Sequence, residues 1–444
     1  MSKYKYPNKI PFHEFILNSS KIAKNPIPFQ NKWLKQNNNV FYVKPYFQES
    51  VIITCKSEIA KDILQKKHKH FHKSKIQTQF LSKYIGYGLL TSSGDYWLQQ
   101  RRLIQPGFHR DKIKNLVDVI DTTIKTQLKI VPLNKEVDLY SIMHELAFEV
   151  VAKSLFNFST EKNTLKRLQF IIEKLQQFIT IEIRQPYKKL GFLLSGKYKY
   201  HNKLVKESRE IIENIIIQRK TTNQEHDDLL QMLLDSKYED GSSMTNEQLI
   251  DEIMILFVAG HETTANALTF ILTLLAKHKD VLNKVEAEVE QASSTTNDAL
   301  QSISSLTYLT NCINESLRLY PPAWITDRVA VEDIQLQDFY IKKGTMIGIS
   351  IYELHRNSAN WKNPNQFIPE RFIDNPELLK SDAYMPFGAG PRLCIGNNFA
   401  MFEMVLTVFE IIKKFKISTA TETIKVNPLI TLKPVGLTLK FKNR

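Results

Sequence analysis

A long helical stretch in the third quarter of the chain constrains the fold more than any other feature of the sequence. Residues 245–248 (TNEQ) form a capping box, the pattern that begins a helix, and apolar residues then recur at helical spacing to about Ala276. At 1.5 Å per residue this helix would be roughly 45–50 Å long, enough to cross an entire domain. We therefore expect a large domain built around one buried helix.

The rest of the pattern also favours helices, with a smaller β-rich part. Periodic apolar residues predict a helix over 138–156, and further helices are expected over 57–66, 160–220, 280–291, 305–320 and 397–415. Strands are expected at 40–43, 50–54 and 429–441, and residues 334–341 and 345–352 predict a hairpin. No stretch resembles an interdomain linker. Residues 1–444 are therefore expected to form one domain, mainly α with a minor β-rich part.

The chain is strongly basic, with 60 Lys and Arg against 46 Asp and Glu, a formal net charge of +14. The densest basic run, residues 66–75, is interpreted as a solvated loop. Nucleic-acid binding is not expected, because no binding fold or basic stripe with interleaved aromatic residues is visible. An acidic protein partner makes better use of the charge, since long-range attraction steers encounters.

The cysteines and the apolar segments indicate a cytoplasmic protein. Cys55, Cys312 and Cys394 are too few and too scattered for a disulfide framework. The start of the chain has no apolar core of signal-peptide length. The most apolar stretch, residues 253–260, is far shorter than the roughly 18–20 residues that a membrane span needs. We expect a monomer with no membrane span.

The segment around Cys394 is rich in glycine and proline, the residues that most strongly affect backbone conformation. Residues 386–396 read PFGAGPRLCIG, and a helix is expected to follow. Its prolines and glycines predict a rigid loop with close backbone approaches, which would present the sulfur at the N-terminus of that helix. There the partial positive charge and free N–H groups favour a thiolate. Cys55 and Cys312 lack such surroundings and are interpreted as small buried hydrophobic residues.

Residues 387–396 match FxxGxRxCxG, the haem-binding loop of cytochromes P450, at every specified position. Four more segments are similar to motifs of that family and follow in its order: WLQQR at 97–101, AGHETT at 259–264, ESLR at 315–318 and PERF at 369–372. The chain thus resembles the cytochrome P450 family over most of its length. It resembles the fatty-acid-hydroxylase and microsomal-like branches more than the camphor-hydroxylase type. The resemblance implies a triangular, mainly α fold.

The resemblance also implies a b-type haem, iron protoporphyrin IX, with the Cys394 thiolate as its metal ligand. A thiolate ligand pushes electron density toward dioxygen and favours O–O cleavage. Phe387 is expected to shield the sulfur, and Gly396 to lie beside it. The haem carboxylates need cationic or N–H donors inside the protein. The residues expected to supply them are Trp97, Arg101, Arg328 and Arg392.

Glu315 and Arg318 lie three residues apart on one helix face, so both can point toward Arg371 of the PERF segment. We expect a buried Glu–Arg–Arg network that holds the haem loop and is structural rather than catalytic. Loss of one member would leave uncompensated buried charge and cost about 3–5 kcal/mol.

Residues 259–264 carry the groups expected to handle protons. In the family this helix is distorted to form a groove, and Gly260 and Thr263 are expected to interrupt it here. By the resemblance, the Thr263 hydroxyl donates a hydrogen bond to dioxygen, and Glu262 relays protons from solvent. His261 is expected to face outward or to join a water network, and not to bind a metal.

Together these residues imply a haem-thiolate monooxygenase, which uses O2, two electrons and two protons to hydroxylate a substrate and release water. Only 50 residues follow Cys394, so the electrons are expected from a separate ferredoxin or flavodoxin with its reductase. Arg102, Arg110 and Lys112 are candidate contacts for this acidic partner. One alternative is a haem-thiolate enzyme that uses peroxide or rearranges a hydroperoxide, although the intact Glu262-Thr263 pair argues against it. A haem-based sensor or binding protein is a remoter alternative.

The substrate pocket is expected to be mostly apolar, so the substrate should be hydrophobic. Fatty acids are the first expectation, and terpenoids, sterols and carotenoids stay open. Lys44 and Tyr46 are the candidates for holding a substrate carboxylate. The residues that the resemblance places around the pocket are Leu89, Phe257, Val258, Ala259, Ala323, Trp324 and Leu429.

Overall fold

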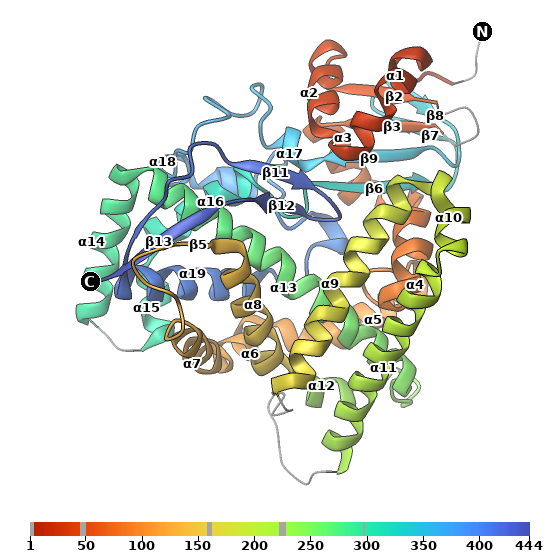
Figure 1. Ribbon diagram of the computed structural model, residues 1–444. Helices are drawn as coiled ribbons and strands as arrows, with labels where there is room; N and C mark the ends of the chain where they lie inside the picture. Colours follow the sequence, from red (N-terminus) through yellow and green to blue (C-terminus); the bar gives the residue numbers. More distant parts are fainter. Residues whose placement is uncertain (1–3, 45–49, 158–161, 222–227, 296–297) are drawn as a thin grey trace.

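The computed structural model describes residues 4–44, 50–157, 162–221, 228–295 and 298–444. Tyr46 lies outside these residues. Helices dominate the described chain, and α13 (Asn246–Lys277) runs through its interior (Figure 1). The predicted capping box is confirmed: the Thr245 hydroxyl accepts the Gln248 N–H at 3.2 Å, and the Gln248 side chain accepts the Thr245 N–H at 2.8 Å.

α13 is buried along most of its length because it is surrounded by other helices. It packs against α8 (Leu139–Phe156), α19 (Asn397–Lys414), α16 (Thr307–Leu319) and α11 (Lys197–Thr221). Its length and composition would suffice to cross a membrane, but 78% of its most apolar window is buried inside the protein. Such burial is typical of a core helix.

The remaining α-helices of the described chain lie around this core or beside the β-rich part (Figure 1). They are α1 (Phe12–Lys24), α2 (Ile27–Gln36), α3 (Ser57–Lys61), α4 (Ser82–Ile85), α5 (Gly94–Ile104), α6 (Arg110–Asn115), α7 (Val117–Gln127), α9 (Lys162–Arg184), α10 (Lys189–Leu194), α12 (Leu229–Asp235), α14 (Lys279–Thr295), α15 (Ala299–Ser305), α17 (Ile351–Leu354) and α18 (Glu370–Asp374). A π-helical segment, η1 (Asp62–Lys66), continues α3, so the helix predicted over 57–66 is present in two parts.

A mixed six-stranded sheet forms the main β-rich part, beside the N-terminal helices (Figure 1). Its order is β1 (Asn8–Lys9), β2 (Val40–Val43), β3 (Val51–Thr54), β9 (Met346–Ser350), β6 (Ile325–Ala330) and β4 (Phe71–His72). A three-stranded sheet has the order β10 (Phe415–Ser418), β13 (Thr438–Asn443) and β5 (Glu136–Asp138). Two pairs complete the described strands: β11 (Lys425–Pro428) with β12 (Leu432–Val435), and β7 (Ile334–Leu336) with β8 (Phe339–Ile341). The expected mainly α class with a minor β-rich part is confirmed.

The hairpin predicted from 334–341 and 345–352 is wrong. The first run folds on itself, because Gln337 takes a positive φ of 52° and turns β7 back onto β8. The second run becomes β9, which pairs in parallel with β3 and antiparallel with β6. β9 is thus an interior strand, and its Ile347 and Ile349 side chains are buried in the sheet core.

Candidate active site

The loop that carries Cys394 is held by contacts that only glycine permits. Gly390 has a φ of +68°, and a Cβ there would lie 1.9 Å from the carbonyl oxygen of Leu64. The Cys394 N–H donates to the carbonyl of Phe387 at 2.9 Å, which closes the loop. Gly396 is the N-cap of α19, as the sequence predicts for a cysteine at a helix N-terminus.

Cys394 differs from the other two cysteines in its exposure. Cys55 and Cys312 are buried, as predicted, whereas Cys394 is exposed and forms no disulfide. Desolvation by the surrounding protein raises the pKa of the Cys394 thiol, and the Gly396 N–H and the Arg101 guanidinium oppose that shift. An accessible sulfur with an N–H donor and a cation beside it is suited to act as a thiolate ligand.

Basic side chains from three distant segments meet near this loop. Arg392 lies over the Trp97 ring, 3.8 Å from its centroid, and donates to the carbonyl of Ser92 at 2.9 Å. Arg101 donates to the carbonyl of Leu393 at 2.8 Å. Arg328 is buried and donates to the carbonyl of Asp327 at 2.6 Å.

The cluster has more positive than negative charge. Burial, together with Arg328 and Arg101, lowers the pKa of Arg392 to about 9. Burial and the charges of Arg392 and Arg328 lower the pKa of Lys73 well below its usual value, and Asp327 only partly opposes them. Anionic carboxylates placed here would relieve this repulsion, so the cluster fits the two carboxylates of a haem.

Lys73 belongs to the basic cluster although no motif of the sequence indicates it. It belongs to the run 66–75, which was interpreted as a solvated loop, and that interpretation is wrong for this residue. Lys73 is half-buried, and its ammonium donates to the carbonyl of Leu90. The sequence signal that could have found it is the density of lysine and histidine ahead of the WxxxR segment.

The buried Glu–Arg–Arg network is present as predicted. Arg318 donates two hydrogen bonds to Glu315, at 2.7 and 2.8 Å, and Arg371 donates to the same carboxylate at 3.0 Å. Arg318 also donates to the carbonyls of His355, Pro364 and Gln366. The network therefore ties α16 to the segment that leads to the Cys394 loop.

His355 extends this network to the loop itself. Its Nδ1 donates to the carbonyl of Arg318 at 3.1 Å, and its Nε2 accepts the N–H of Met385 at 2.8 Å. Both bonds require the neutral ring, and burial beside Arg318 lowers its pKa to about 3. His355 has no ligand spacing in the sequence, and its role here is to join α16 to the residue before Pro386.

α13 is helical throughout, so the interruption predicted at Gly260 and Thr263 is wrong. The Thr263 hydroxyl donates to the carbonyl of Ala259 at 2.7 Å, and the Thr264 hydroxyl donates to that of Gly260 at 2.9 Å. Such bonds to the preceding turn let threonine stay inside a helix. Ala259 is exposed and Thr263 half-buried, so this face of α13 is accessible although the helix lies in the core.

Glu262 and Thr263 do not share one face of α13, since consecutive helical residues are about 100° apart. Glu262 is buried, and its Oε1 lies 3.8 Å from Nζ of Lys433 on β12. Burial raises the Glu262 pKa, while Lys433 and hydrogen bonds from Thr431 and Gln176 oppose the shift. Lys433 is a contact that sequence spacing could not reveal.

His261 was expected to face outward or to join a water network, and the outward placement is wrong. It is fully buried, and its Nδ1 donates to the carbonyl of Phe257 at 2.7 Å. Its Nε2 lies 3.2 Å from Nε2 of His144, whose Nδ1 accepts from Gln169 at 3.0 Å. This chain of bonds requires both rings to be neutral, in agreement with the pKa of about 3 for His261 and about 4 for His144 that burial produces.

Comparison with known proteins identifies the family to which these motifs belong. The family model described as Cytochrome P450 matches residues 7–441. The chain belongs to this family. It is 32% identical over 435 residues to a cytokinin hydroxylase of Arabidopsis thaliana, a match that covers 95% of this chain and 84% of the relative.

Two further cytochrome P450 relatives differ in their named substrates. The chain is 30% identical over 335 residues to the cyclooctat-9-en-7-ol 5-monooxygenase of Streptomyces melanosporofaciens, covering 75% of this chain and 73% of the relative. It is 29% identical over 416 residues to leukotriene-B4 omega-hydroxylase 3 of Mus musculus, covering 87% of this chain and 79% of the relative. The chain is a cytochrome P450 monooxygenase, and the family implies a haem-thiolate cofactor.

The residues predicted for the substrate pocket of this cytochrome P450 separate into two groups. Ala259 and Ala323 are exposed, and Leu89, Val258 and Leu429 are half-buried. Phe257 and Trp324 have almost no exposed surface.

Aromatic and apolar packing explains the burial of Phe257 and Trp324. Phe257 packs against Phe148 and Phe156, with ring centroids 5.4 and 4.8 Å away. Trp324 lies in a small apolar cluster, and its indole N–H donates to the carbonyl of Leu429 at 3.0 Å. Its role here is to hold the Leu429 turn.

Two carboxylates of α13 hold the loop that carries Leu89. Tyr87 N–H donates to Asp251 at 2.8 Å, and Leu89 N–H donates to Glu252 at 3.0 Å. The loop lies so close to α13 that a Cβ at Gly88 would come within 2.6 Å of the Glu252 carboxyl. Lys73 binds the next carbonyl, that of Leu90, so this loop joins α13 to the basic cluster.

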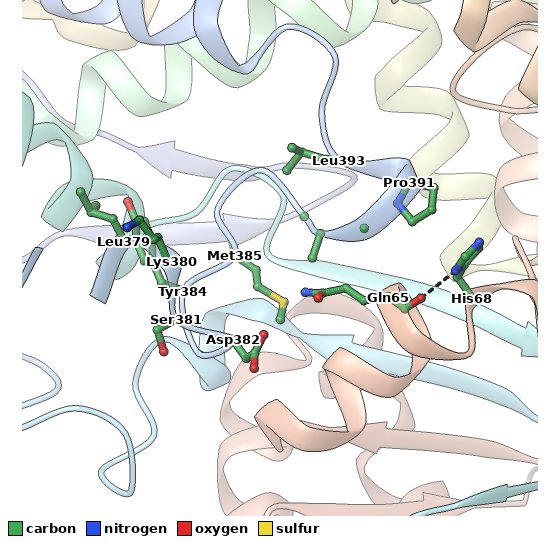
Figure 2. Close-up of a pocket in the computed structure, with 13 residues that line it drawn as sticks. Gln65, His68, Leu379, Lys380, Ser381, Asp382, Tyr384, Met385, Pro391 and Leu393 are labelled. Carbon is green, nitrogen blue, oxygen red and sulfur yellow. Dashed lines mark hydrogen bonds between the residues drawn. The ribbon is translucent and has the colours of Figure 1, made fainter. Parts of the chain in front are cut away.

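A surface pocket with a volume of about 400 Å3 is lined in part by the loop that carries Cys394. Figure 2 shows Pro391 and Leu393 of the loop across from Gln65 and His68, with Lys380 and Asp382 at another part of the wall. The three predicted partner contacts, Arg102, Arg110 and Lys112, are exposed. Arg102 forms an ion pair with Glu239 at 2.8 Å, which reduces the positive charge that it offers to a partner.

Proposed function

We propose that this chain binds a b-type haem through Cys394 and inserts one oxygen atom of O2 into a hydrophobic small molecule. The observation that carries the proposal is the accessible Cys394 thiol beside Arg101 and a buried cluster with excess positive charge. When bound, the haem supplies the site of dioxygen activation. Arg101, Arg328, Arg392 and Lys73 would hold its carboxylates, and Trp97 orients Arg392 by stacking.

Two residues of α13, Glu262 and Thr263, are proposed to handle the protons of the reaction. Thr263 places a hydroxyl on the accessible face of α13, where its oxygen can accept one hydrogen bond while it donates to Ala259. Glu262 holds a carboxyl on the adjacent face, and Lys433 stabilises its ionised form. We infer that Glu262 takes up protons on that side and that Thr263 positions them at the accessible face.

The substrate is proposed to be a hydrophobic molecule of the fatty-acid, terpenoid, sterol or carotenoid class. Support comes from the apolar residues Leu89, Val258, Ala259 and Ala323 and from the substrates named for the relatives. None of these four apolar side chains carries a charge that could pair with a substrate.

We further propose that the chain acts as one cytoplasmic domain and receives electrons from a separate ferredoxin or flavodoxin. Its two buried, unpaired cysteines suit a reducing compartment. The exposed basic residues Arg110 and Lys112 fit an acidic donor, and the pocket beside Pro391 and Leu393 gives that donor a recessed surface next to the haem loop.

The test is the spectrum of the reduced carbon monoxide complex, which shows a red-shifted Soret band when a thiolate is the axial ligand. We expect this band in the wild type, in Cys55→Ala and in Cys312→Ala, and its loss in Cys394→Ala. A Cys394→Ala protein that kept the band would refute the assignment. Turnover with O2 and a surrogate reductase chain, but not with peroxide alone, is expected for the monooxygenase.

A further inference from the structure

The side of α13 that carries Glu262 faces a group of polar side chains from α8, α9 and β12. On α9, Gln169, Glu173 and Gln176 lie on one face of the helix, because they are spaced by four and three residues. Gln169 donates to His144 of α8 at 3.0 Å, and Gln176 hydrogen-bonds the Glu262 carboxyl. Glu173 lies between these two contacts and is half-buried, so its carboxylate is close to the group and also reaches solvent.

Tyr140 of α8 is the member of this group whose hydroxyl is not used by the fold. That hydroxyl is buried and has no hydrogen-bond partner among the described residues. The Lys433 ammonium lies 4.5 Å from the centroid of the Tyr140 ring and 3.8 Å from Oε1 of Glu262. Burial and nearby carboxylates, first Glu262 and then Glu173, raise the pKa of the Tyr140 hydroxyl. Tyr140 therefore keeps a proton that it can donate, close to two carboxylates.

The neighbouring histidines cannot carry protons to Glu262. Nδ1 of His261 donates to the carbonyl of Phe257, and Nδ1 of His144 accepts from α9. The remaining nitrogens of the two rings face each other at 3.2 Å, so all four are engaged. Burial keeps both rings neutral, with a pKa of about 3 for His261 and about 4 for His144. The pair fastens α13 to α8, and an additional proton would break it.

We propose that Glu173 and Tyr140 form a proton inlet that connects Glu262 to solvent between α8 and α9. A proton that Glu173 takes up from solvent moves to the Tyr140 oxygen, while the hydroxyl proton of Tyr140 moves to the Glu262 carboxylate. Tyr140 stays neutral, Glu173 returns to its ionised form, and one proton has passed from solvent to Glu262. Water can bridge these groups, since buried polar atoms without a protein partner usually bind it. The proposal rests on the proposed role of Glu262 and names the source of its protons.

Lys433 fits this inlet as a fixed positive charge rather than as a member of the relay. A protonated lysine has no lone pair and cannot accept a proton. Its position beside Oε1 favours the ionised form of Glu262, which is the form that accepts the next proton.

The first experiment follows hydrogen exchange at the Glu262 carboxyl and needs no turnover. The haem-loaded protein is mixed with heavy water at mildly acidic pH, and the shift of the infrared band of the protonated carboxyl is timed. Loss of the band in Glu262→Gln assigns it. We expect roughly tenfold slower exchange in Tyr140→Phe and in Glu173→Gln than in the wild type. Exchange at the wild-type rate in both variants would show that protons reach Glu262 by another route, and would overturn the proposal.

The second experiment measures turnover with a surrogate reductase chain. In Tyr140→Phe and in Glu173→Gln, oxygen consumption should slow roughly tenfold and its solvent isotope effect should grow, because proton uptake limits the rate. Product formed per NADH should stay near the wild-type value, since Thr263 is unchanged. Lower coupling with unchanged oxygen consumption would contradict an inlet that supplies Glu262.

Tyr308→Phe and Glu213→Gln are the matched controls. Tyr308 donates to Glu370 at 2.7 Å on α16, and Glu213 is exposed on α11. Both variants should exchange and turn over as the wild type does, and equal slowing in the controls would refute the inlet.

Thermal unfolding separates a relay from a merely structural role. Tyr140→Phe removes an oxygen that has no hydrogen-bond partner in the described part of the chain, so stability should be unchanged. A merely structural Tyr140 would predict normal carboxyl exchange in this variant, which would overturn the proposal. Slowed exchange in a protein without any O2-dependent turnover would support the inlet and would instead contradict the proposed monooxygenase activity.

Discussion

Glu262 and Lys433 join the central helix to a C-terminal strand, with 3.8 Å between Oε1 and Nζ. Lys433 also lies 4.5 Å from the centroid of the Tyr140 ring, and its side chain is mostly shielded from solvent. The carboxyl expected to relay protons therefore has one cation beside it, and that cation opposes the rise in pKa caused by burial.

Replacing that cation should change the pH dependence of turnover. In Lys433→Met the Glu262 pKa should rise further, because the buried carboxylate loses its opposite charge. If ionised Glu262 takes up protons, the acidic limb of the activity profile should move to higher pH by about one unit or more. The measurement is oxygen consumption from pH 5.5 to 9 with a surrogate reductase chain. Lys425→Met, on the neighbouring strand β11, is the control and should keep the wild-type profile.

Thr263 and Thr264 offer a matched pair, since both hydroxyls donate to a carbonyl four residues earlier. Thr263 is half-buried on the accessible face of α13, whereas Thr264 is buried. In Thr263→Ala, product formed per NADH should fall and hydrogen peroxide should rise, because the hydroxyl no longer positions a proton. Glu262→Gln should instead slow oxygen consumption, with about 10²–10⁴-fold as the scale for a lost general acid.

Thr264→Ala should leave the coupling of NADH to product unchanged. The four quantities to compare are NADH used, oxygen consumed, peroxide formed and product formed. Unchanged coupling in Thr263→Ala would mean that this hydroxyl does not position protons, and the peroxide-driven alternative would then become the leading hypothesis.

The Glu315–Arg318–Arg371 network predicts a defect in haem loading that is stronger than a defect in turnover. Lysine at position 318 keeps one charge but cannot reach Glu315 and the carbonyls of His355, Pro364 and Gln366 together. Arg318→Lys should lose stability, up to the about 3–5 kcal/mol expected when a buried ion pair is broken, and should yield little haem-loaded protein.

Arg219→Lys provides the comparison, because Arg219 also forms a buried pair, with Asp228 at 2.8 Å, but belongs to α11. It should lose stability without a selective loss of haem. Urea unfolding and the ratio of haem to protein measure the two effects. Normal haem content in Arg318→Lys with selectively reduced activity would contradict a structural role.

The parts of this site that the sequence predicted are those encoded by short segments. The loop at 386–396 and the i, i+3 pair of Glu315 and Arg318 depend on neighbouring residues, so local rules suffice. The structure adds the long-range part: Lys73, Arg328 and Arg392 meet only because β4 and β6 are paired and the Cys394 loop packs on η1.

The predictions that were wrong also depend on long-range contacts. Residues 334–341 and 345–352 both alternate as strands do, and alternation cannot say that β9 pairs with β3 nearly 300 residues earlier. His261 is a polar residue of α13 with no side-chain partner nearby in the sequence, and its contact with His144 on α8 explains how it can be buried. The sequence alone gives no sign that Glu262 and Lys433 are in contact.

Glu252 accepts the Leu89 N–H through Oε2, and its Oε1 has no hydrogen-bond partner among the described residues. Burial, with a smaller contribution from Asp251, raises its pKa from 4.5 to about 7. The native carboxyl thus keeps its proton to a higher pH than the unfolded one. The stability that it contributes is complete below pH 4.5 and is lost as the pH rises through about 7.

Glu252→Gln removes this titration, because an amide stays neutral at every pH and keeps an oxygen for the Leu89 N–H. Between pH 5 and pH 8 the variant should lose less stability than the wild type, by up to about 3 kcal/mol, since each unit of pKa difference is worth about 1.36 kcal/mol. Urea unfolding at the two pH values measures the difference. Glu247→Gln, at an exposed position on the same helix, should behave as the wild type does. Equal losses in Glu252→Gln and the wild type would mean that burial does not keep Glu252 protonated, and that the loop carrying Leu89 is held by an ionised carboxylate throughout this pH range.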